Sequence, residues 1–231
     1  MNTTIRTGLK DIPLNDFALN LLSKSEWFHK EENYNATIKG FDQYHNDKDA
    51  DYYTGEEYMR EIMAKNQDHD GFPEVIVSHS FGKTNLKFQP NQAHRDLEVL
   101  EQIEKVNNTL QRNLCLKQNA LFAVYPPGGY ISWHNNANAP AYNLIFTYSE
   151  TGDGWFQYYD MSKEKVITIQ DKPGWQCKGG YFGAYAQPRR TWCYHAARNG
   201  HSGIRMTIAY TFDRHQMSMN IQDDVIEDIS A

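Results

Sequence analysis

The feature that most constrains the fold is a change of texture at Asn119, after which short β-branched and aromatic runs follow one another along the chain. Clusters of Gly, Pro, Asn and Asp separate these runs, and such clusters are typical of turns between strands. About eight runs of this kind are present: ALFAVY, GYISWH, YNLIFTYS, GWFQYYD, KVITIQ, GYFGAYA, TWCYHA and GIRMTIAYTF. Many short strands joined by tight turns predict a β-sandwich or a jelly roll.

The remainder of the chain has a different pattern. Residues 1–118 are expected to be helical and irregular, and residues 214–231 to form a C-terminal extension. Asn15 and Thr54 are placed to cap helices that run through FALNLLSKSEWF and GEEYMREIMAKN. The charged stretch at residues 29–53 has no clean period and is expected to be a loop or a lid. With 231 residues, 40% of them apolar, the chain can bury one core, and we expect a single domain.

Charge and composition argue against several classes of protein. The formal net charge is -6, the pI is about 5.8, and no run of Lys or Arg forms a basic stripe, which disfavours binding to duplex nucleic acid. No stretch approaches the ~18 apolar residues of a membrane span, and the N-terminus lacks the apolar segment of a signal peptide. The three cysteines have no CxxC spacing, so they suggest neither a disulfide framework nor a zinc site. We therefore expect a cytoplasmic protein that does not act at a membrane.

Polar side chains gather on one face of the second predicted strand. Because side chains alternate between the two faces of a strand, every second residue of GYISWHNN points the same way. The residues that share the polar face are Tyr130, Ser132, His134 and Asn136. Two potential metal ligands, an imidazole and an amide, are thus expected to project together.

The last predicted strand, RMTIAYTF, has an apolar face and an opposite face that carries Arg205 and Thr207. An arginine on an inward strand face needs an anion. His195 lies at the end of TWCYHA, and the turn within ARNGHSG would return the chain so that His195 and Arg205 lie on adjacent strands. These two side chains are expected to line one pocket.

Taken together, YPPGGYISWHNN and YHAARNGHSGIRMT resemble the 2-oxoglutarate- and iron(II)-dependent oxygenases, especially their prolyl-hydroxylase-like branch. That family has a Tyr some nine residues before an HxD pair and a second His about sixty residues later. An Arg follows about ten residues beyond the second His, with Ser or Thr two positions after it. The residues that occupy these places are Tyr125, His134, His195, Arg205 and Thr207.

The resemblance implies a mainly β protein, a double-stranded β-helix over residues 119–213 with N-terminal helices packed on it. It also implies a non-haem iron(II) ion, which takes two imidazoles and a carboxylate on one octahedral face. His134 and His195 would be two of the ligands, and Asn136 stands at the third position.

The same resemblance implies 2-oxoglutarate as cosubstrate. A guanidinium forks onto a carboxylate through two hydrogen bonds, so Arg205 would hold the distal carboxylate, with the hydroxyl of Thr207 beside it. The phenol of Tyr125 or of Tyr148 could donate a further hydrogen bond.

The chain departs from the family at Asn136, where the family has Asp or Glu. An amide oxygen can bind a hard cation but brings no negative charge, so affinity for iron(II) should fall. Halogenating members of the family have Ala or Gly there to make room for chloride, and Asn is larger. Asp153 and Asp160 are the nearest later carboxylates, and neither is an obvious substitute. His201 is a rival second ligand, but it lies too close to Arg205 for the pattern.

These features predict a 2-oxoglutarate-dependent dioxygenase that hydroxylates a small-molecule or peptide substrate. Peptidyl proline or asparagine, a free amino acid and a nucleobase all stay open as substrates. One alternative is a non-catalytic jelly-roll binding module that has lost the metal carboxylate. A third interpretation, a cupin-type metal-dependent isomerase or dioxygenase, is disfavoured because cupins usually place extra His or Glu ligands close to the first pair.

Overall fold

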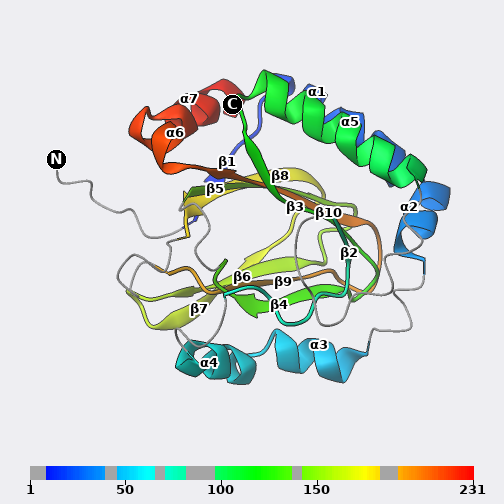
Figure 1. Ribbon diagram of the computed structural model, residues 1–231. Coiled ribbons are helices and arrows are strands. Elements are labelled where there is room, and N and C mark those ends of the chain that lie inside the picture. The colour runs from blue at the N-terminus through cyan, green and yellow to red at the C-terminus, as the bar shows by residue number, and fades with distance from the viewer. Residues whose placement is uncertain (1–8, 40–45, 66–70, 82–96, 137–141, 183–191) are drawn as a thin grey trace.

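Two antiparallel β-sheets face each other, and helices cover both outer faces (Figure 1). The computed structural model describes residues 9–39, 46–65, 71–81, 97–136, 142–182 and 192–231. The large sheet has the strand order β1-β8-β5-β10-β3-β2, and the small sheet has the order β4-β9-β6-β7. The bounds of the strands are β1 (Lys10–Ile12), β2 (His79–Phe81), β3 (Gln118–Tyr125), β4 (Tyr130–His134), β5 (Tyr142–Ser149), β6 (Trp155–Asp160), β7 (Lys165–Gln170), β8 (Gly174–Tyr181), β9 (His195–Arg198) and β10 (Arg205–Phe212).

The path of the chain through β3 to β10 defines the fold. Strands β3, β5, β8 and β10 belong to the large sheet, and β4, β6, β7 and β9 belong to the small sheet. The chain therefore crosses between the sheets at almost every turn, and only β6 and β7 form a hairpin within one sheet. This is the strand order of a double-stranded β-helix, or jelly roll. The predicted fold class is confirmed.

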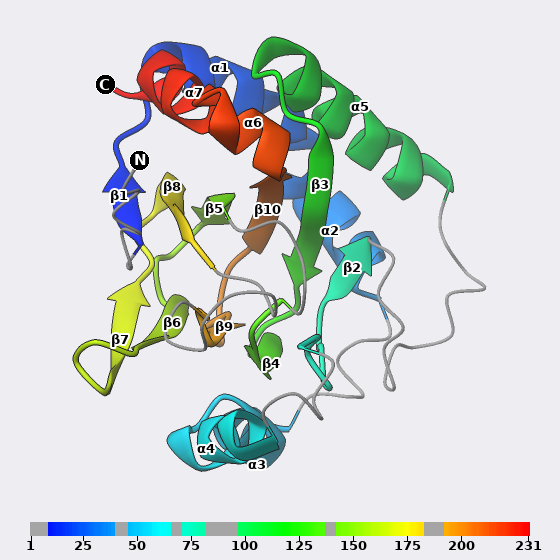
Figure 2. The same cartoon turned by 60° about the vertical axis from the view of Figure 1, so that its left-hand side comes forward.

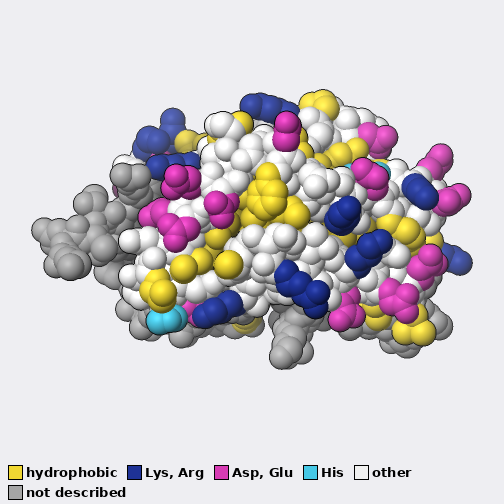
Figure 3. Space-filling model, turned by 90° about the horizontal axis from the view of Figure 1, so that it is seen from above, with side chains coloured by type: hydrophobic (Ala, Val, Ile, Leu, Met, Phe, Trp, Pro, Cys, Tyr) yellow, Lys and Arg dark blue, Asp and Glu magenta, His cyan; other side chains and the backbone are white. Residues whose placement is uncertain are grey.

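Helices fill the outer side of each sheet (Figures 1 and 2). The large sheet is covered by α1 (Asp16–Leu22), η1 (Ser23–His29), α2 (Glu31–Ile38), α5 (Leu97–Asn113), α6 (Arg214–Ser218) and α7 (Ile221–Ile229). The small sheet is covered by α3 (Asp47–Tyr53) and α4 (Glu56–Lys65). The largest core lies between the large sheet and its helices, where Val106 and Leu110 of α5 pack with Phe122, Phe146 and Ile208. Seen from that side, the surface mixes acidic and basic side chains around apolar patches (Figure 3).

The helix caps only partly follow the sequence prediction. Asn15 caps α1, because its side chain accepts a hydrogen bond from Ala18 N at 2.9 Å. Thr54 does not cap α4: its hydroxyl donates to Ala50 O at 2.6 Å, so it ends α3 instead. The loop expected at residues 29–53 is wrong, because this stretch contains α2 and α3. Four of its acidic residues, Glu31, Glu32, Asp47 and Asp49, stand in the first turns of these helices, where the helix dipole favours negative charge.

Two strand boundaries also differ from the prediction. Strand β8 begins at Gly174 and runs through CKGG, which the sequence pattern indicates as a turn. A larger residue inside this strand would crowd its neighbours, because a Cβ at Gly179 would lie 2.7 Å from Tyr142 Oη and 2.9 Å from Ile12 Cδ1. Strand β9 begins at His195. The prediction instead places His195 near the end of a strand. The second half of the predicted strand GYFGAYA lies outside the described residues.

Within the described ranges, no helix is both long and apolar enough to cross a lipid bilayer.

Candidate metal centre

A bulge in β4 decides which way His134 points. Strand β4 pairs with β9 at Ile131 and again at His134, with an irregular register between them. The extra residue puts both Ile131 and His134 on the inner face, although regular alternation would place them on opposite faces. Ile131 packs on Tyr125, inside the barrel, and Tyr130 packs on the outer side with residues of α3 and of the segment before β2. The prediction that Tyr130 and His134 share a face is therefore wrong.

The position of Trp133, the residue before His134, agrees with this bulge, because its side chain lies on the outer face of the small sheet. It packs with Tyr58, Met59 and Ile62 of α4, and its indole donates to Thr54 O at 2.7 Å. Trp133 is fully buried between α4 and the small sheet. The large outward side chain thus anchors the strand while its neighbour, His134, enters the barrel.

The two predicted metal-ligating histidines lie side by side. His134 and His195 are opposite each other in the β4–β9 ladder, their ring centroids are 4.0 Å apart, and both are buried. Each Nδ1 lies 2.8 Å from the carbonyl oxygen two residues earlier, at Ser132 and Cys193 respectively. A carbonyl only accepts, so each Nδ1 carries the proton and each Nε2 keeps its lone pair. Metal-binding histidines are oriented in this way in proteins.

Burial also keeps His195 in the form that can bind a cation. It lowers the pKa of His195 well below its usual range, and the neighbouring His134 lowers it further. Neutral imidazole is therefore the form of His195 near neutral pH. Phe156 and Phe182 pack against its ring and exclude water from that side.

The third ligand position has no negative charge. Among the described residues, no three His, Cys, Asp or Glu side chains gather closely enough to hold a metal ion. Asn136 follows His134 at φ 62°, in the left-handed region that asparagine tolerates. Asp153 binds Thr151 and Ser202 in a turn.

The other candidate ligands lie elsewhere. Asp160 binds Ser162 and Lys163 at the end of β6. His201 is exposed, and its Nε2 lies 3.8 Å from Asp47 Oδ1. The donor set that fits iron(II) thus consists of two imidazoles and, at most, one amide oxygen.

Three of the four predicted cosubstrate residues meet inside the barrel. Arg205 is fully buried, and its Nη1 donates to Thr207 Oγ1 at 3.1 Å. Its guanidinium carbon lies 4.7 Å from the centre of the Tyr125 ring. The predicted alternation of β10 is confirmed, because Met206 and Ile208 pack in the core on the opposite face.

The fourth, Tyr148, lies on the wrong face. It belongs to the core between the large sheet and its helices, and it stacks on His29 with ring centroids 3.9 Å apart. The predicted adjacency of His195 and Arg205 is also wrong. In a jelly roll consecutive strands alternate between sheets, so β9 and β10 belong to different sheets and these two residues lie across the barrel from each other.

Sequence reasoning missed the anion that Arg205 requires, because the chain itself supplies it. Arg205 Nε donates to Asp171 Oδ2 at 2.7 Å, and the two side chains are 1% and 0% exposed. Burial alone would lower the pKa of Arg205, but Asp171 and Tyr125 together more than offset this and raise it. Gly154 lets the pair form, because a Cβ there would lie 2.7 Å from Asp171 Oδ2. The sequence places Asp171 in a turn signal, DKPG, which hid its role.

A second buried cation, Lys178, was also not predicted from the sequence, because the CKGG segment that contains it resembles a turn. Lys178 is 1% exposed and stands in the middle of β8. Its neighbour Cys177 packs in the outer core, and its cross-strand partner Ile145 packs inside the barrel. The Lys178 side chain therefore points inward. Burial lowers its pKa, Arg205 acts in the same direction, and Asp171 and Asp11, its partner across the β1–β8 ladder, act to raise it.

The strand that carries His195 is tied to a helix outside the barrel. Arg198 of β9 forms ion pairs with Asp47 and Asp51 of α3. Its side chain is 13% exposed, whereas the two carboxylates are largely exposed. Strands β4 and β9 thus both contact the α3–α4 region, through Trp133 and Arg198.

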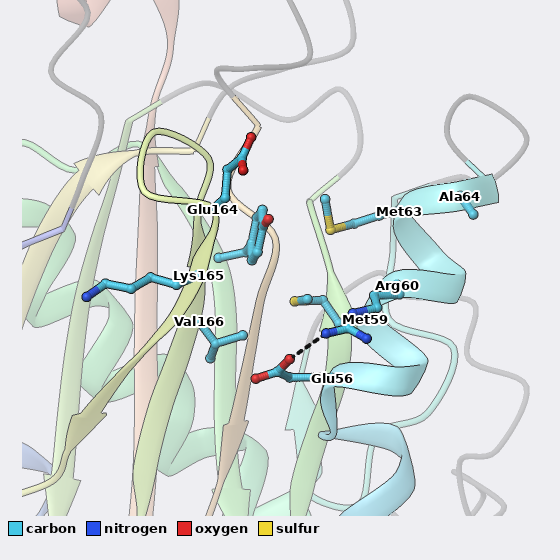
Figure 4. A pocket seen from close by; sticks show the side chains of 9 residues that line it. Glu56, Met59, Arg60, Met63, Ala64, Glu164, Lys165 and Val166 are labelled. Atoms are coloured by element: carbon cyan, nitrogen blue, oxygen red, sulfur yellow. Dashed lines mark hydrogen bonds and ion pairs between the residues drawn. The ribbon is translucent and has the colours of Figure 1, made fainter.

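A surface pocket of about 340 Å³ lies on the outer side of the small sheet, between α4 and the β6–β7 hairpin (Figure 4). Met59, Met63 and Val166 form its apolar part, and the Glu56–Arg60 ion pair, at 3.0 Å, lies at its side. Because α4 covers the face opposite the histidine pair, this pocket is separate from the candidate metal centre.

The molecule is thus a double-stranded β-helix with a buried histidine pair and a buried cluster of charges in one barrel. No family model and no curated protein sequence matches the chain. It is similar to a Pseudomonas putida prolyl-4-hydroxylase (TM-score 0.36, 11% identity, 71% of this chain and 90% of that one). It is also similar to a viral collagen prolyl hydroxylase of Paramecium Bursaria Chlorella virus-1, solved as a 2OG complex (TM-score 0.32, 14% identity, 68% and 89%).

The cupin domain of Schizosaccharomyces pombe Cnp3 is a further similar structure (TM-score 0.26, 13% identity, 43% of this chain and 59% of that one). Similarity at these values carries no argument about activity. The jelly-roll assignment rests on the strand order itself.

Proposed function

We propose that the protein is a 2-oxoglutarate- and iron(II)-dependent oxygenase that hydroxylates a small molecule or a peptide. The observation that carries this proposal is the paired arrangement of His134 and His195, each with Nδ1 bound to a main-chain carbonyl. The buried Arg205 with Thr207 in the same barrel supports it. A cytoplasmic location belongs to the proposal, because the free cysteines would stay reduced there.

In this proposal His134 and His195 bind iron(II) through Nε2, and Asn136 offers its amide oxygen. Bound iron(II) would supply the chemistry that activates dioxygen, with 2-oxoglutarate as the two-electron reductant that leaves as succinate and carbon dioxide, so that one oxygen atom enters a C–H bond of the substrate. The protein ligands are all neutral, so the negative charge that the family takes from its carboxylate has to come from the cosubstrate. Metal binding and cosubstrate binding should therefore be strongly coupled, and iron affinity should be low without 2-oxoglutarate.

The side chains of the barrel orient the cosubstrate. A guanidinium has five N–H donors, and within the described residues Arg205 uses one on Asp171, one on Thr207 and one, at 3.4 Å, on Trp155 O. Two donors, one on each terminal nitrogen, remain for a carboxylate. Tyr125 Oη is buried beside Arg205 and Thr207, from where it can donate to the same carboxylate.

A second candidate function is a non-catalytic binding module that holds a small anion in the same barrel. The observation that favours it is the missing third ligand of the metal centre. In this case the charge cluster around Arg205 would be the functional site, and the histidines would be structural.

Metal content and succinate formation separate the two. The protein is loaded with iron(II) under anaerobic conditions in the presence of 2-oxoglutarate, and bound iron is measured after desalting. We expect one iron per chain, lost in His134→Ala and in His195→Ala, and retained in the matched control His201→Ala, whose histidine is exposed.

Succinate is then measured after oxygen is admitted, with and without a chelator. Chelator-sensitive succinate supports the oxygenase. Binding of 2-oxoglutarate without iron, and without succinate, would favour the binding module.

A further inference from the structure

The carbonyl that orients His134 belongs to a strand, although carbonyls within a strand normally take part in the sheet. Ser132 lies inside β4, and its carbonyl oxygen lies 2.8 Å from His134 Nδ1. The second histidine has no such conflict. His195 is oriented by the carbonyl of Cys193, which precedes the first residue of β9 and stands outside the ladders of β9 with β4 and β6. Ser132 therefore has to serve both the strand pairing and the imidazole.

The free edge of β4 shows how this conflict is resolved. The segment before β2 pairs antiparallel with this edge, and Tyr130 and Val77 exchange two main-chain hydrogen bonds, at 2.8 Å and 3.1 Å. In a regular ladder the next pair, Ser132 and Val75, would also exchange two main-chain bonds. Ser132 N does donate to Val75 O at 3.0 Å, but Val75 N donates to the side-chain oxygen Oγ of Ser132 at 3.2 Å. The hydroxyl thus takes the place of the carbonyl in the ladder, and the carbonyl is released to accept from His134 Nδ1.

Contacts from helix α4 fix the direction of this hydroxyl. Ser132 is fully buried, and its hydroxyl is hydrogen-bonded to Tyr58 Oη. Tyr58 Oη in turn donates to Glu74 Oε2 at 3.0 Å, and Lys65 Nζ lies 2.9 Å from the other oxygen of that carboxylate. Because Tyr58 uses its single proton on Glu74, it can only accept from Ser132. The hydroxyl proton of Ser132 therefore points toward Tyr58, which leaves the oxygen lone pairs for Val75 N.

We propose that Ser132 is a positioning residue for the metal ligand His134. Its hydroxyl replaces the main-chain carbonyl in the pairing of β4 with Val75. The carbonyl can then hold the Nδ1 proton of the imidazole, which leaves Nε2 with the lone pair that binds a metal ion. The hydrogen bonds that reach this hydroxyl from α4 keep it in that orientation. The part of the inference that concerns the metal rests on the proposed function, whereas the hydrogen-bonding role of Ser132 does not.

The first test uses the metal-free protein, so its result does not depend on the proposed function. Nuclear magnetic resonance of protein whose histidines are isotope-labelled at both ring nitrogens reports which nitrogen of each ring carries the proton. Ser132→Ala removes the hydroxyl, so Val75 N turns to the Ser132 carbonyl and competes there with His134 Nδ1. We expect both rings to carry the proton on Nδ1 in the parent, and only His134 to lose this fixed tautomer in Ser132→Ala. His195 is an internal reference, because Cys193 holds it.

Three further variants separate the hydrogen bond from packing. Ser132→Thr keeps a hydroxyl at the same position and should restore the tautomer of His134. Ser132→Cys fills the same space with a weaker acceptor, so it should act as Ser132→Ala does without leaving a cavity. Ser25→Ala is the matched control: it removes another fully buried serine hydroxyl, which donates to Leu22 O at 2.6 Å in η1, and it should leave both rings unchanged. Melting curves show that each variant folds.

The second test measures iron(II) affinity under anaerobic conditions in the presence of 2-oxoglutarate. Loss of a group that orients a metal-ligating histidine typically weakens metal binding by about 10–100-fold. Ser132→Ala and Ser132→Cys should therefore weaken iron(II) binding by at least about 10-fold. Ser132→Thr and Ser25→Ala should stay near the parent.

The inference is overturned if His134 has the same tautomer in Ser132→Ala and Ser132→Cys as in the parent, or if His195 changes to the same extent. It is also overturned if these two variants bind iron(II) as tightly as the parent does. If the parent itself binds no iron(II), the proposed function fails, and the tautomers alone decide the role of Ser132.

Discussion

The Arg205–Asp171 pair allows a stability experiment whose outcome depends on which partner is removed. Both side chains are fully buried, so solvent does not screen the charge that is left behind. Removing one partner of a buried ion pair typically costs about 3–5 kcal/mol, whereas replacing both with apolar residues is close to neutral. The surroundings of the pair are not symmetric, because Lys178 adds a second cation.

Asp171→Leu leaves two buried cations without a buried carboxylate, so its loss of stability should lie at the upper end of that range. Arg205→Met leaves Asp171 with Lys178 as a new partner, so its loss should lie at the lower end. In a domain of this size about 3 kcal/mol lowers the melting temperature by roughly 6–12 °C. The double variant Asp171→Leu/Arg205→Met should be more stable than Asp171→Leu alone.

Urea titrations followed by circular dichroism give the four free energies of unfolding that form this double-mutant cycle. The reasoning would be refuted if Arg205→Met were more destabilising than Asp171→Leu, or if the two losses simply added in the double variant.

Three further predictions concern the scaffold. Trp133→Phe removes the indole donor to Thr54 O, leaves that carbonyl buried and unpaired, and should lower the free energy of unfolding in urea by about 1–3 kcal/mol. Burial lowers the pKa of His29 below 6.5, with Glu26 and Glu150 opposing the shift, so the unfolded chain takes up the proton first as pH falls. Stability should therefore be complete above pH 6.5 and decrease below it, and His29→Phe should reduce this slope in urea titrations at several pH values; an unchanged slope would contradict the assignment. Gly179→Ala should lower the melting temperature because its Cβ would lie 2.7 Å from Tyr142 Oη, and Tyr142→Phe in the same chain should recover part of the loss; no change on Gly179→Ala would show that β8 yields easily.

The sequence predicts this fold well where the strand pattern is regular. The alternation in β10 is unbroken, so the inward face with Arg205 and Thr207 follows from a period of two. The bulge in β4 could not be foreseen, because a bulge depends on the pairing of two strands and changes nothing in the composition of either one. The same holds for β8, where Gly179 resembles a turn residue but serves close packing. Strand pairing and close packing depend on residues far apart in the sequence, so the pattern of a single segment does not predict them.

The candidate site shows the same division. The meeting of His134 with His195 is consistent with their spacing in the sequence, although their roles stay a prediction. The roles of Asp171 and Lys178 were not predicted, because each residue lies in a segment with turn-forming residues. A buried charge is also recognised only from the residues around it in the folded protein. The requirement that an inward arginine must have an anion was correct in principle. The chain satisfies it internally, which no local pattern indicates.

Helix α3 has a consequence for how the histidine pair responds to its surroundings. It holds β9 through ion pairs between Arg198 and two exposed carboxylates, while the neighbouring Thr54 holds β4 through the buried indole of Trp133. One of these two attachments weakens with ionic strength, and the other does not. Helix α3 therefore links the two strands that carry His134 and His195. Its contact with β4 should be insensitive to salt, whereas high salt should weaken its contact with β9.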